Sequence, residues 1–175
     1  MSRPSVLTVV SCGETKIDLD PGESVPAREL YDSSVHTCKD RYGRHSDGYY
    51  IMSAEYGLVH SQTELAYYDR TLDEMSDLQV RAWGRRVALT LQEVALEFDA
   101  VVLIGSETYV GALKPHFDRI PATVLTPWQT SDYVTGVGRG MAWCNDELNW
   151  PENVSPVGDI GEIVSAGIAS IDRPV

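Results

Sequence analysis

Short, nearly continuous apolar runs alternate along the chain with amphipathic stretches. Four of these runs are rich in β-branched residues, and they cover residues 5–10, 49–52, 100–104 and 123–125. Such runs are typical of strands that are covered on both faces, as in a parallel sheet. The alternation predicts a three-layer α/β fold, in which a central, mainly parallel sheet of about four strands has helices on both faces.

Helical periodicity predicts the segments that connect these strands. A first helix is expected from Pro26 to about Arg44. One face of it carries every fourth residue, namely Leu30, Ser34, Cys38 and Tyr42. The clearest helix covers 78–98, where apolar residues recur at steps of three and four. Shorter helices are predicted over 107–117 and, despite the glycines of GVGRG, over 136–148.

The organisation of the chain predicts one domain. No repeat, low-complexity tract or linker divides the 175 residues, and this length suits a single core. We therefore expect a single α/β domain over 1–175 with its core at 5–149. Prolines and glycines are frequent afterwards, which predicts a loop-rich extension over 150–175 with at most one short helix near 161–170.

The charge balance limits the classes of partner. The net charge is −12, and the 14 basic residues include only three lysines. This balance disfavours broad contact with duplex DNA, because non-specific binding depends on many contacts between basic side chains and phosphates. It still allows a local basic pocket that grips one nucleotide. An acidic, lysine-poor surface also fits a halophilic source.

No targeting or membrane segment is expected. No apolar run approaches the roughly 20 residues that span a bilayer, and the first residues lead directly into a predicted strand. We therefore expect a cytoplasmic protein with no membrane partner. The three cysteines, Cys12, Cys38 and Cys144, form no CxxC pair, which argues against a disulfide framework or a structural zinc site. Neither a metal nor another cofactor is expected.

Small and polar residues follow each predicted strand. These segments are SCGETK (11–16), SAEYG (53–57), GSETY (105–109) and TPWQTSDY (126–133). In an open parallel sheet the ligand crevice lies outside the carboxyl ends of the strands, so we expect the four segments to converge on one cleft. Small residues in them would let the backbone approach a ligand: Ser11, Gly13, Ser53, Gly57, Gly105 and Ser106.

Four motifs in the first half of the chain follow one another in a specific order. They are S-C-G-x-x-K (11–16), P-A-x-x-L-Y-x-S (26–33), Y-Y-I-M-S-A-x-Y-G-L (49–58) and Y-D-x-T-L (68–72). The series resembles an uncharacterised domain family of archaea, bacteria and phages, densely over 9–72 and loosely to about Leu148. The chain departs from that family at Glu55, where members usually carry Lys, and this puts phosphate contact from that loop in doubt.

The layout is similar, more distantly, to the core domain of archaeosine synthase, to a peroxide-stress protein family and to the α/β fold of uracil-DNA glycosylases. In archaeosine synthase a lysine attacks the nitrile of a deazaguanine base in tRNA, and Lys16 matches that lysine by motif. Tyr31, Ser33 and His36 lie in a stretch comparable to the Y-S-x-S-x-x-H of that family, with different spacing. These resemblances imply a nucleobase or nucleotide as the partner, often one held in DNA or RNA.

Five residues are candidates for catalysis: Lys16, Glu55, Asp69, His36 and Cys12. Lys16 is a nucleophile if burial or a nearby cation keeps it neutral, and otherwise it grips a phosphate or carboxylate. Glu55 and Asp69 could activate water or stabilise cationic character at a glycosidic carbon, although Asp69 could instead fix the YDRTL turn. His36 suits an acid/base role or a buried hydrogen bond. Cys12 is a thiolate beside a cation such as Lys16 or His36, or an apolar filler.

Other residues are candidates for substrate binding. Tyr56, Tyr68 and Trp128 could stack on a base, each contributing about 1–3 kcal/mol, or belong to the core. The GVGRG run suggests a phosphate cradle at a helix start, with Arg139 as its partner. Tyr31 and Ser33 complete the set through the resemblance to archaeosine synthase.

These expectations favour an enzyme of the N-glycosidase or base-modifying type that modifies or excises a base in DNA or RNA. A base within a duplex would have to be extruded to reach the cleft. Two alternatives remain open. One is a non-catalytic module that senses a modified base or nucleotide, and the other is an enzyme for a free nucleotide or small metabolite, which the acidic charge supports.

Overall fold

A five-stranded sheet forms the centre of a computed structural model that describes residues 3–153. Its strands are β1 (Val6–Ser11), β3 (Gly48–Ser53), β4 (Gly57–His60), β6 (Ala100–Ile104) and β7 (Thr123–Leu125). They lie in the order β4-β3-β1-β6-β7, and only β4 runs antiparallel to its neighbour. The predicted α/β class with a mainly parallel sheet is confirmed, with five strands in place of about four.

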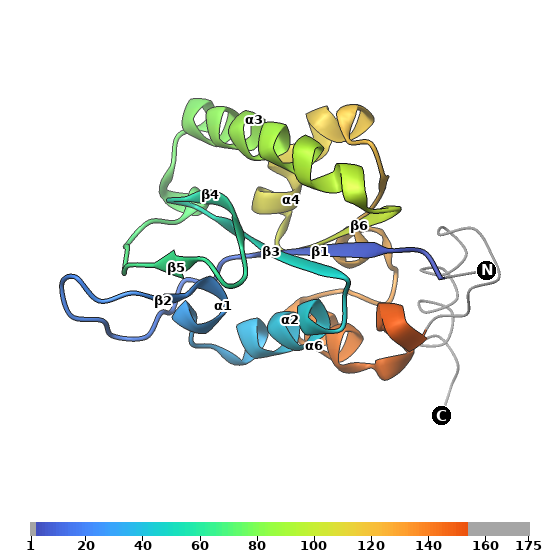
Figure 1. Cartoon of the computed structure of the whole chain (residues 1–175), viewed down its shortest axis with the longest axis horizontal. Helices are drawn as coiled ribbons and strands as arrows, with labels where there is room; N and C mark the ends of the chain where they lie inside the picture. Colours follow the sequence, from blue (N-terminus) through green and yellow to red (C-terminus); the bar gives the residue numbers. More distant parts are fainter. Residues whose placement is uncertain (1–2, 154–175) are drawn as a thin grey trace.

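Helices cover both faces of this sheet (Figure 1). The helices α3 (Asp77–Val94) and α4 (Glu107–Leu113) pack together on one face, and α2 (Ser34–Arg44) and α6 (Val137–Asn145) pack together on the other. The connection that leaves β1 therefore runs to one face, while the connection that leaves its neighbour β6 runs to the other. This divergence creates a topological switch point between the carboxyl ends of β1 and β6.

Shorter elements complete the described fold. The strands β2 (Val25–Pro26) and β5 (Glu64–Leu65) form a separate antiparallel pair. The short α-helices are α1 (Ala27–Leu30) and α5 (Pro127–Thr130). The 3-10 turns are η1 (Leu72–Glu74), η2 (Ala95–Glu97), η3 (Lys114–Arg119), η4 (Glu147–Asn149) and η5 (Pro151–Asn153).

The two central strands are buried along their whole length, as their continuous apolar sequence requires. Every residue of β1 and β6 is buried, because layers of helices cover the strands from both sides. Burying each large aliphatic side chain contributes about 1.5–3 kcal/mol relative to its exposure. The carboxyl ends of β1 and β6 are thus fixed on a rigid platform.

The helix predicted over 78–98 is confirmed in its first part. Ser76 accepts a hydrogen bond from the N–H of Gln79, whose side chain accepts one in return from the N–H of Ser76. This capping box starts α3. The α-helix ends at Val94, and a 3-10 turn carries the chain on toward β6. The two other predicted helices also end early in the structure, at Leu113 and Asn145.

The single helix predicted over 26–44 is wrong. The chain forms two helices there, α1 and α2, with a break between them. At the break Ser33 is extended, and its hydroxyl accepts a hydrogen bond of 3.0 Å from the N–H of His36. Ser33 therefore caps α2 and ends the continuity that the apolar spacing suggested. The preceding Tyr31 forms an isolated antiparallel bridge with Lys16.

Two further expectations concern membrane-spanning helices and the C-terminal segment. No helix within residues 3–153 is both long and apolar enough to cross a bilayer. The short helix expected near 161–170 lies outside the described residues.

Candidate functional site

A pocket of about 390 Å³ lies at the switch point between β1 and β6. The loop 11–15 that follows β1 forms one wall. The remaining lining comes from the start of α2, the segment around η1, the start of α4, and the segments that follow β7: Ser33, Val35, Lys39, Thr71, Asp73, Ser106, Tyr109, Trp128 and Val137. Open α/β sheets bind ligands at this position. Three of the four predicted strand-end segments thus meet here, those after β1, β6 and β7.

A second hollow of about 510 Å³ adjoins this pocket. Ser106 and Trp128 line both, so the two hollows form one groove across the carboxyl ends of the strands. The second part is also lined by Gly105, Gln129 and Gly136.

Lys39 is the buried cation of the pocket. Its side chain points from α2 to the end of β1, and the residue is only 4% exposed. Its Nζ donates to the carbonyl oxygen of Ser11 at 2.7 Å and to the Ser11 Oγ at 3.1 Å. Burial lowers the pKa of Lys39 to about 8. Among the salt bridges of residues 3–153, none includes this amine.

Sequence reasoning missed Lys39, although the chain carries a signal for it. The residue lies next to Cys38 and three positions before Tyr42, so it borders the face of α2 that was expected to be buried. Lysine is almost never fully buried unless it has a partner, so the pattern by itself favoured exposure.

The close approach of β6 to β1 depends on Gly105. A Cβ at this position would lie 2.6 Å from Ser11 Oγ and 2.8 Å from Ser11 Cβ, which is too close for any side chain. The missing side chain leaves room for the Ser11 hydroxyl that contacts Lys39. On the other side, Gln129 Nε2 donates to the carbonyl oxygen of Gly105 at 2.7 Å.

Cys12 and Tyr109 form the wall beside this amine. The Cys12 Sγ donates to the Tyr109 hydroxyl at 3.3 Å, and the same hydroxyl accepts a hydrogen bond of 3.3 Å from the N–H of Leu72. Burial raises the pKa of Tyr109, which keeps its hydroxyl protonated. A cationic neighbour was the condition for a reactive Cys12, and Lys39 is close enough to interact with it electrostatically.

Trp128 supplies a flat apolar surface to both parts of the groove. Its ring rests against α6 at Gly140, where a Cβ would lie 2.8 Å from the indole. This contact gives a structural reason for the last glycine of the GVGRG run. The indole Nε1 is buried and makes no hydrogen bond within the described part of the chain.

Lys16 lies in a separate aromatic cluster, which we define as Lys16, Tyr31, Tyr56 and Tyr68. The Lys16 Nζ lies 4.4 Å from the centroid of the Tyr68 ring and 5.8 Å from that of Tyr31. The hydroxyls of Tyr31 and Tyr68 are 2.8 Å apart, and burial raises the pKa of both. The amine of Lys16 also donates to the carbonyl oxygen of Glu14 at 3.3 Å, and it does not line the pocket.

His36 is buried behind this cluster. Its Nε2 lies 2.7 Å from the carbonyl oxygen of Arg28, so Nε2 carries the proton and donates. Burial lowers the pKa of His36, which favours the neutral ring. The ring packs against Tyr31 at a centroid distance of 5.2 Å and does not line the pocket. The geometry favours the buried hydrogen bond over the acid/base role.

A family model matches residues 7–146, which is most of the chain. The chain belongs to DUF6884, a family of unknown function. The matched range includes all four motifs that suggested an uncharacterised domain family. No curated protein matches the chain. The similarity of the DUF6884 domain to archaeosine synthase and uracil-DNA glycosylase stays a prediction.

The loop after β3 does not join the other strand-end segments at the pocket of this DUF6884 domain. Because β3 turns back at once into β4, Glu55 and Tyr56 lie at the tip of a hairpin. The carboxylate of Glu55 is 3.4 Å from Arg70. Asp69 is exposed, and neither carboxylate lines the pocket. Tyr56 is 42% exposed, with its ring edge against Tyr68.

The two small residues of this hairpin serve its backbone. The Ser53 Oγ accepts a hydrogen bond of 3.1 Å from the N–H of Tyr56, and the Ser53 carbonyl oxygen accepts one of 2.9 Å from Trp83. Gly57 has a φ of 75°, which suits the turn into β4. Neither Ser53 nor Gly57 lines the pocket.

Arg139 lies away from both parts of the groove. It is exposed on α6, and its guanidinium carbon lies 4.7 Å from the centroid of the Tyr133 ring. Gly136 and Val137, at the start of the same helix, are the members of this region that line the groove.

Proposed function

We propose that this DUF6884 domain is an enzyme that holds a nucleobase or nucleotide in the groove over β1 and β6 and modifies or excises the base, in DNA or RNA. One observation carries the proposal: a pocket at the switch point brings a buried amine, a thiol and a phenol together beside an indole. They belong to Lys39, Cys12, Tyr109 and Trp128. Such a mixture of polar and flat apolar groups is typical of sites for planar heterocycles.

The dimensions support a single nucleotide unit. The pocket of about 390 Å³ falls within the range of sites that enclose small organic ligands. The adjoining hollow offers room for a sugar or a second unit beyond Trp128. A base within a duplex would have to leave the stack before it could enter.

The chemistry is assigned to residues of the pocket. Cys12 is the candidate nucleophile, and Lys39 lies close enough to interact with it electrostatically. Tyr109 contacts the same sulfur at 3.3 Å, and its protonated hydroxyl can act as a proton donor. Glu55, Asp69 and Lys16 do not line the pocket and have no part in this assignment.

A panel of substrates tests this proposal. The protein is incubated with modified bases as free nucleotides, in DNA and in RNA, and mass spectrometry is used to look for a released or altered base. Turnover is expected for one class, with a loss of about 100-fold or more in Cys12→Ser, because removing a catalytic group has effects of this size. Lys16→Met is the matched control outside the pocket. Binding without any product would contradict the enzymatic proposal and favour a sensor.

The acidic surroundings of the groove favour a second candidate, an enzyme for a free nucleotide or small metabolite. Glu14 and Asp73 border the pocket, and their carboxylates would repel the flanking phosphates of a polynucleotide. Salt separates the two candidates, because binding of an oligonucleotide that uses several phosphate contacts weakens steeply with ionic strength.

A further inference from the structure

The charge of Lys39 has no counter-ion in the described residues. The ammonium is buried, and both of its hydrogen bonds go to neutral oxygens of Ser11. Burying a cation without a negative partner is costly, and proteins rarely keep such a group without a use for it. An ammonium has three donors, and these two bonds leave one donor without a partner in the described residues.

The neighbouring titratable groups do not supply the missing charge. On the same helix, burial lowers the pKa of His36 and favours its neutral ring, and Asp40 accepts hydrogen bonds from Arg28. From α6, Cys144 faces the amine, and burial raises the pKa of its thiol to about 12. At the end of β1, the thiol of Cys12 donates to Tyr109.

The two carboxylates at the rim of the pocket, Asp73 and Glu14, do not pair with Lys39. Asp73 is exposed and accepts a hydrogen bond of 3.0 Å from Thr108. Glu14 is exposed in the loop after β1. Neither carboxylate forms a salt bridge with Lys39. The residues around the amine therefore leave a positive charge that faces the pocket.

We infer that the ligand brings the counter-ion, and that the pocket takes an oxyanion, a phosphate monoester or a carboxylate, against the Nζ of Lys39. The first turn of α2 and the start of α6 border the same space at Val35 and Val137. Helix amino termini favour negative charge, so they act in the same direction as the amine. If the proposed function holds, the substrate is a nucleotide that presents its phosphate, or a base that carries a carboxylate. This identification of the ligand rests on the proposed function.

Calorimetry with simple anions tests the inference. Inorganic phosphate, acetate, a purine nucleoside and its 5′-monophosphate are titrated into the wild type and into Lys39→Met. The monophosphate and phosphate are expected to bind the wild type and to lose about 10- to 100-fold in affinity in the variant, because a hydrogen bond to a charged group is removed. Lys16→Met, which removes a cation outside the pocket, is expected to stay within about twofold of the wild type.

A pH series of the wild type gives a second readout that needs no variant. Anion affinity is expected to be constant below pH 8 and to fall roughly tenfold for each pH unit above it, as Lys39 loses its proton. Thermal unfolding of Lys39→Met accompanies these titrations. The variant is expected to melt no lower than the wild type, since an apolar side chain replaces a buried charge.

The outcomes separate this inference from the proposed function. Equal binding of phosphate by wild type and Lys39→Met, or a flat pH profile, overturns the inference. A nucleoside that binds as well as its monophosphate, without anion binding, overturns it while leaving the nucleobase proposal intact. Phosphate binding that depends on Lys39 but gains nothing from the nucleoside supports the inference and contradicts the nucleobase proposal. Binding of acetate in place of phosphate assigns the site to carboxylates.

Discussion

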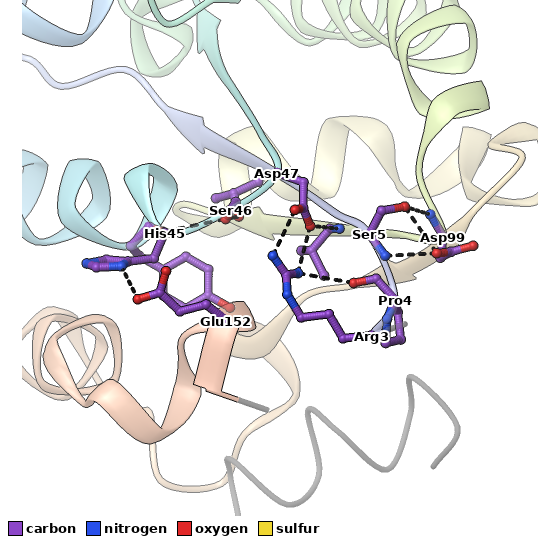
Figure 2. A network of polar contacts seen from close by, with 11 residues as sticks. Arg3, Pro4, Ser5, His45, Ser46, Asp47, Asp99 and Glu152 are labelled. Atoms are coloured by element: carbon purple, nitrogen blue, oxygen red, sulfur yellow. Dashed lines mark hydrogen bonds and ion pairs between the residues drawn. The ribbon is translucent and has the colours of Figure 1, made fainter. Parts of the chain in front are cut away.

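The two ends of the central sheet differ in whether their charged side chains have ionic partners. At the amino end, Figure 2 shows Arg3 bound to Asp47 by two hydrogen bonds of 2.8 Å each, and Asp47 also accepts one of 2.8 Å from the N–H of Val6. At the carboxyl end, Lys39 contacts only neutral oxygens of Ser11. One end pairs its charges within the chain, and the other leaves a cation facing a pocket.

The amino end shows what paired charges do for a fold. Asp99 accepts a hydrogen bond of 2.8 Å from the N–H of Ser5, and its own N–H donates to the Ser5 Oγ at 3.1 Å, so the starts of β1 and β6 are joined. These carboxylates satisfy backbone donors and stabilise the sheet. Lys39 lacks such a partner in the described residues, which agrees with our inference that its charge serves binding.

The largest effect is expected at Asp40, a buried carboxylate next to Lys39 in sequence that does have partners. It accepts hydrogen bonds of 3.0 Å each from Arg28 Nε and Nη2, and one of 3.1 Å from the Tyr49 hydroxyl. Asp40→Ala leaves these donors unpaired and is expected to lower the free energy of unfolding by about 3–5 kcal/mol, measured by urea denaturation. Glu29→Ala removes an exposed partner of Arg28 and should cost less than about 1 kcal/mol.

The second prediction concerns alkaline pH. The pKa of Lys39 is about 8 in the fold and 10.5 in the unfolded chain, so the unfolded chain binds more protons between these values. Stability should therefore rise with pH across this window, by up to about 3 kcal/mol relative to Lys39→Met. Chemical denaturation at several pH values measures it, and parallel curves for the two proteins would show that Lys39 is not a destabilising cation.

The third prediction returns to the amino end. Asp47→Ala removes the acceptor of Val6 and the partner of Arg3, and is expected to cost about 2 kcal/mol in denaturation experiments. Partial burial opposes ionisation, but hydrogen bonds from Arg3 and the backbone outweigh it and lower the pKa of Asp47 below 3.8. The contribution is thus present above pH 3.8 and lost as the pH falls through the folded value. Asp73→Ala, at the other end of the sheet, is the control with little expected change.

The smallest effect is expected for the pair of His45 and Glu152. The His45 Nδ1 lies 2.6 Å from the carboxylate, and the ring stacks on Trp150 at 3.8 Å. Both partners are partly exposed, so Glu152→Gln should cost less than about 1 kcal/mol and the difference should shrink in high salt. A larger loss would mean that this end of the sheet depends on the pair more than exposed ion pairs usually allow.

Most of the sheet could be predicted from the sequence, because its central strands are short, nearly continuous runs of apolar residues. The runs that became β1 and β6 are almost entirely apolar, and burial on both faces accommodates them. The strand β4 escaped prediction, because its first residue, Gly57, belongs to the segment SAEYG (53–57), which was interpreted as a ligand loop. The hairpin is decided by antiparallel pairing with β3, a contact between two strands that the periodicity of either strand alone does not encode.

The site could be predicted in position but not in its central residue. The loops after β1 and β6 follow from the rule for parallel sheets, and Cys12 and Ser106 were expected there. Lys39 comes from the middle of a helix, where a lysine ordinarily points to solvent. Its burial depends on how α2 packs against β1 and α6, which no spacing in the sequence fixes.

The absence of a side chain at position 105 links two distant positions of the chain. A homologue with any bulkier residue there would have to displace Ser11, and the amine of the α2 lysine would lose its support. Gly105 and Lys39 should therefore occur together or be absent together in members of the family. Members that lack both are expected to keep the fold but not to bind an anion at this position.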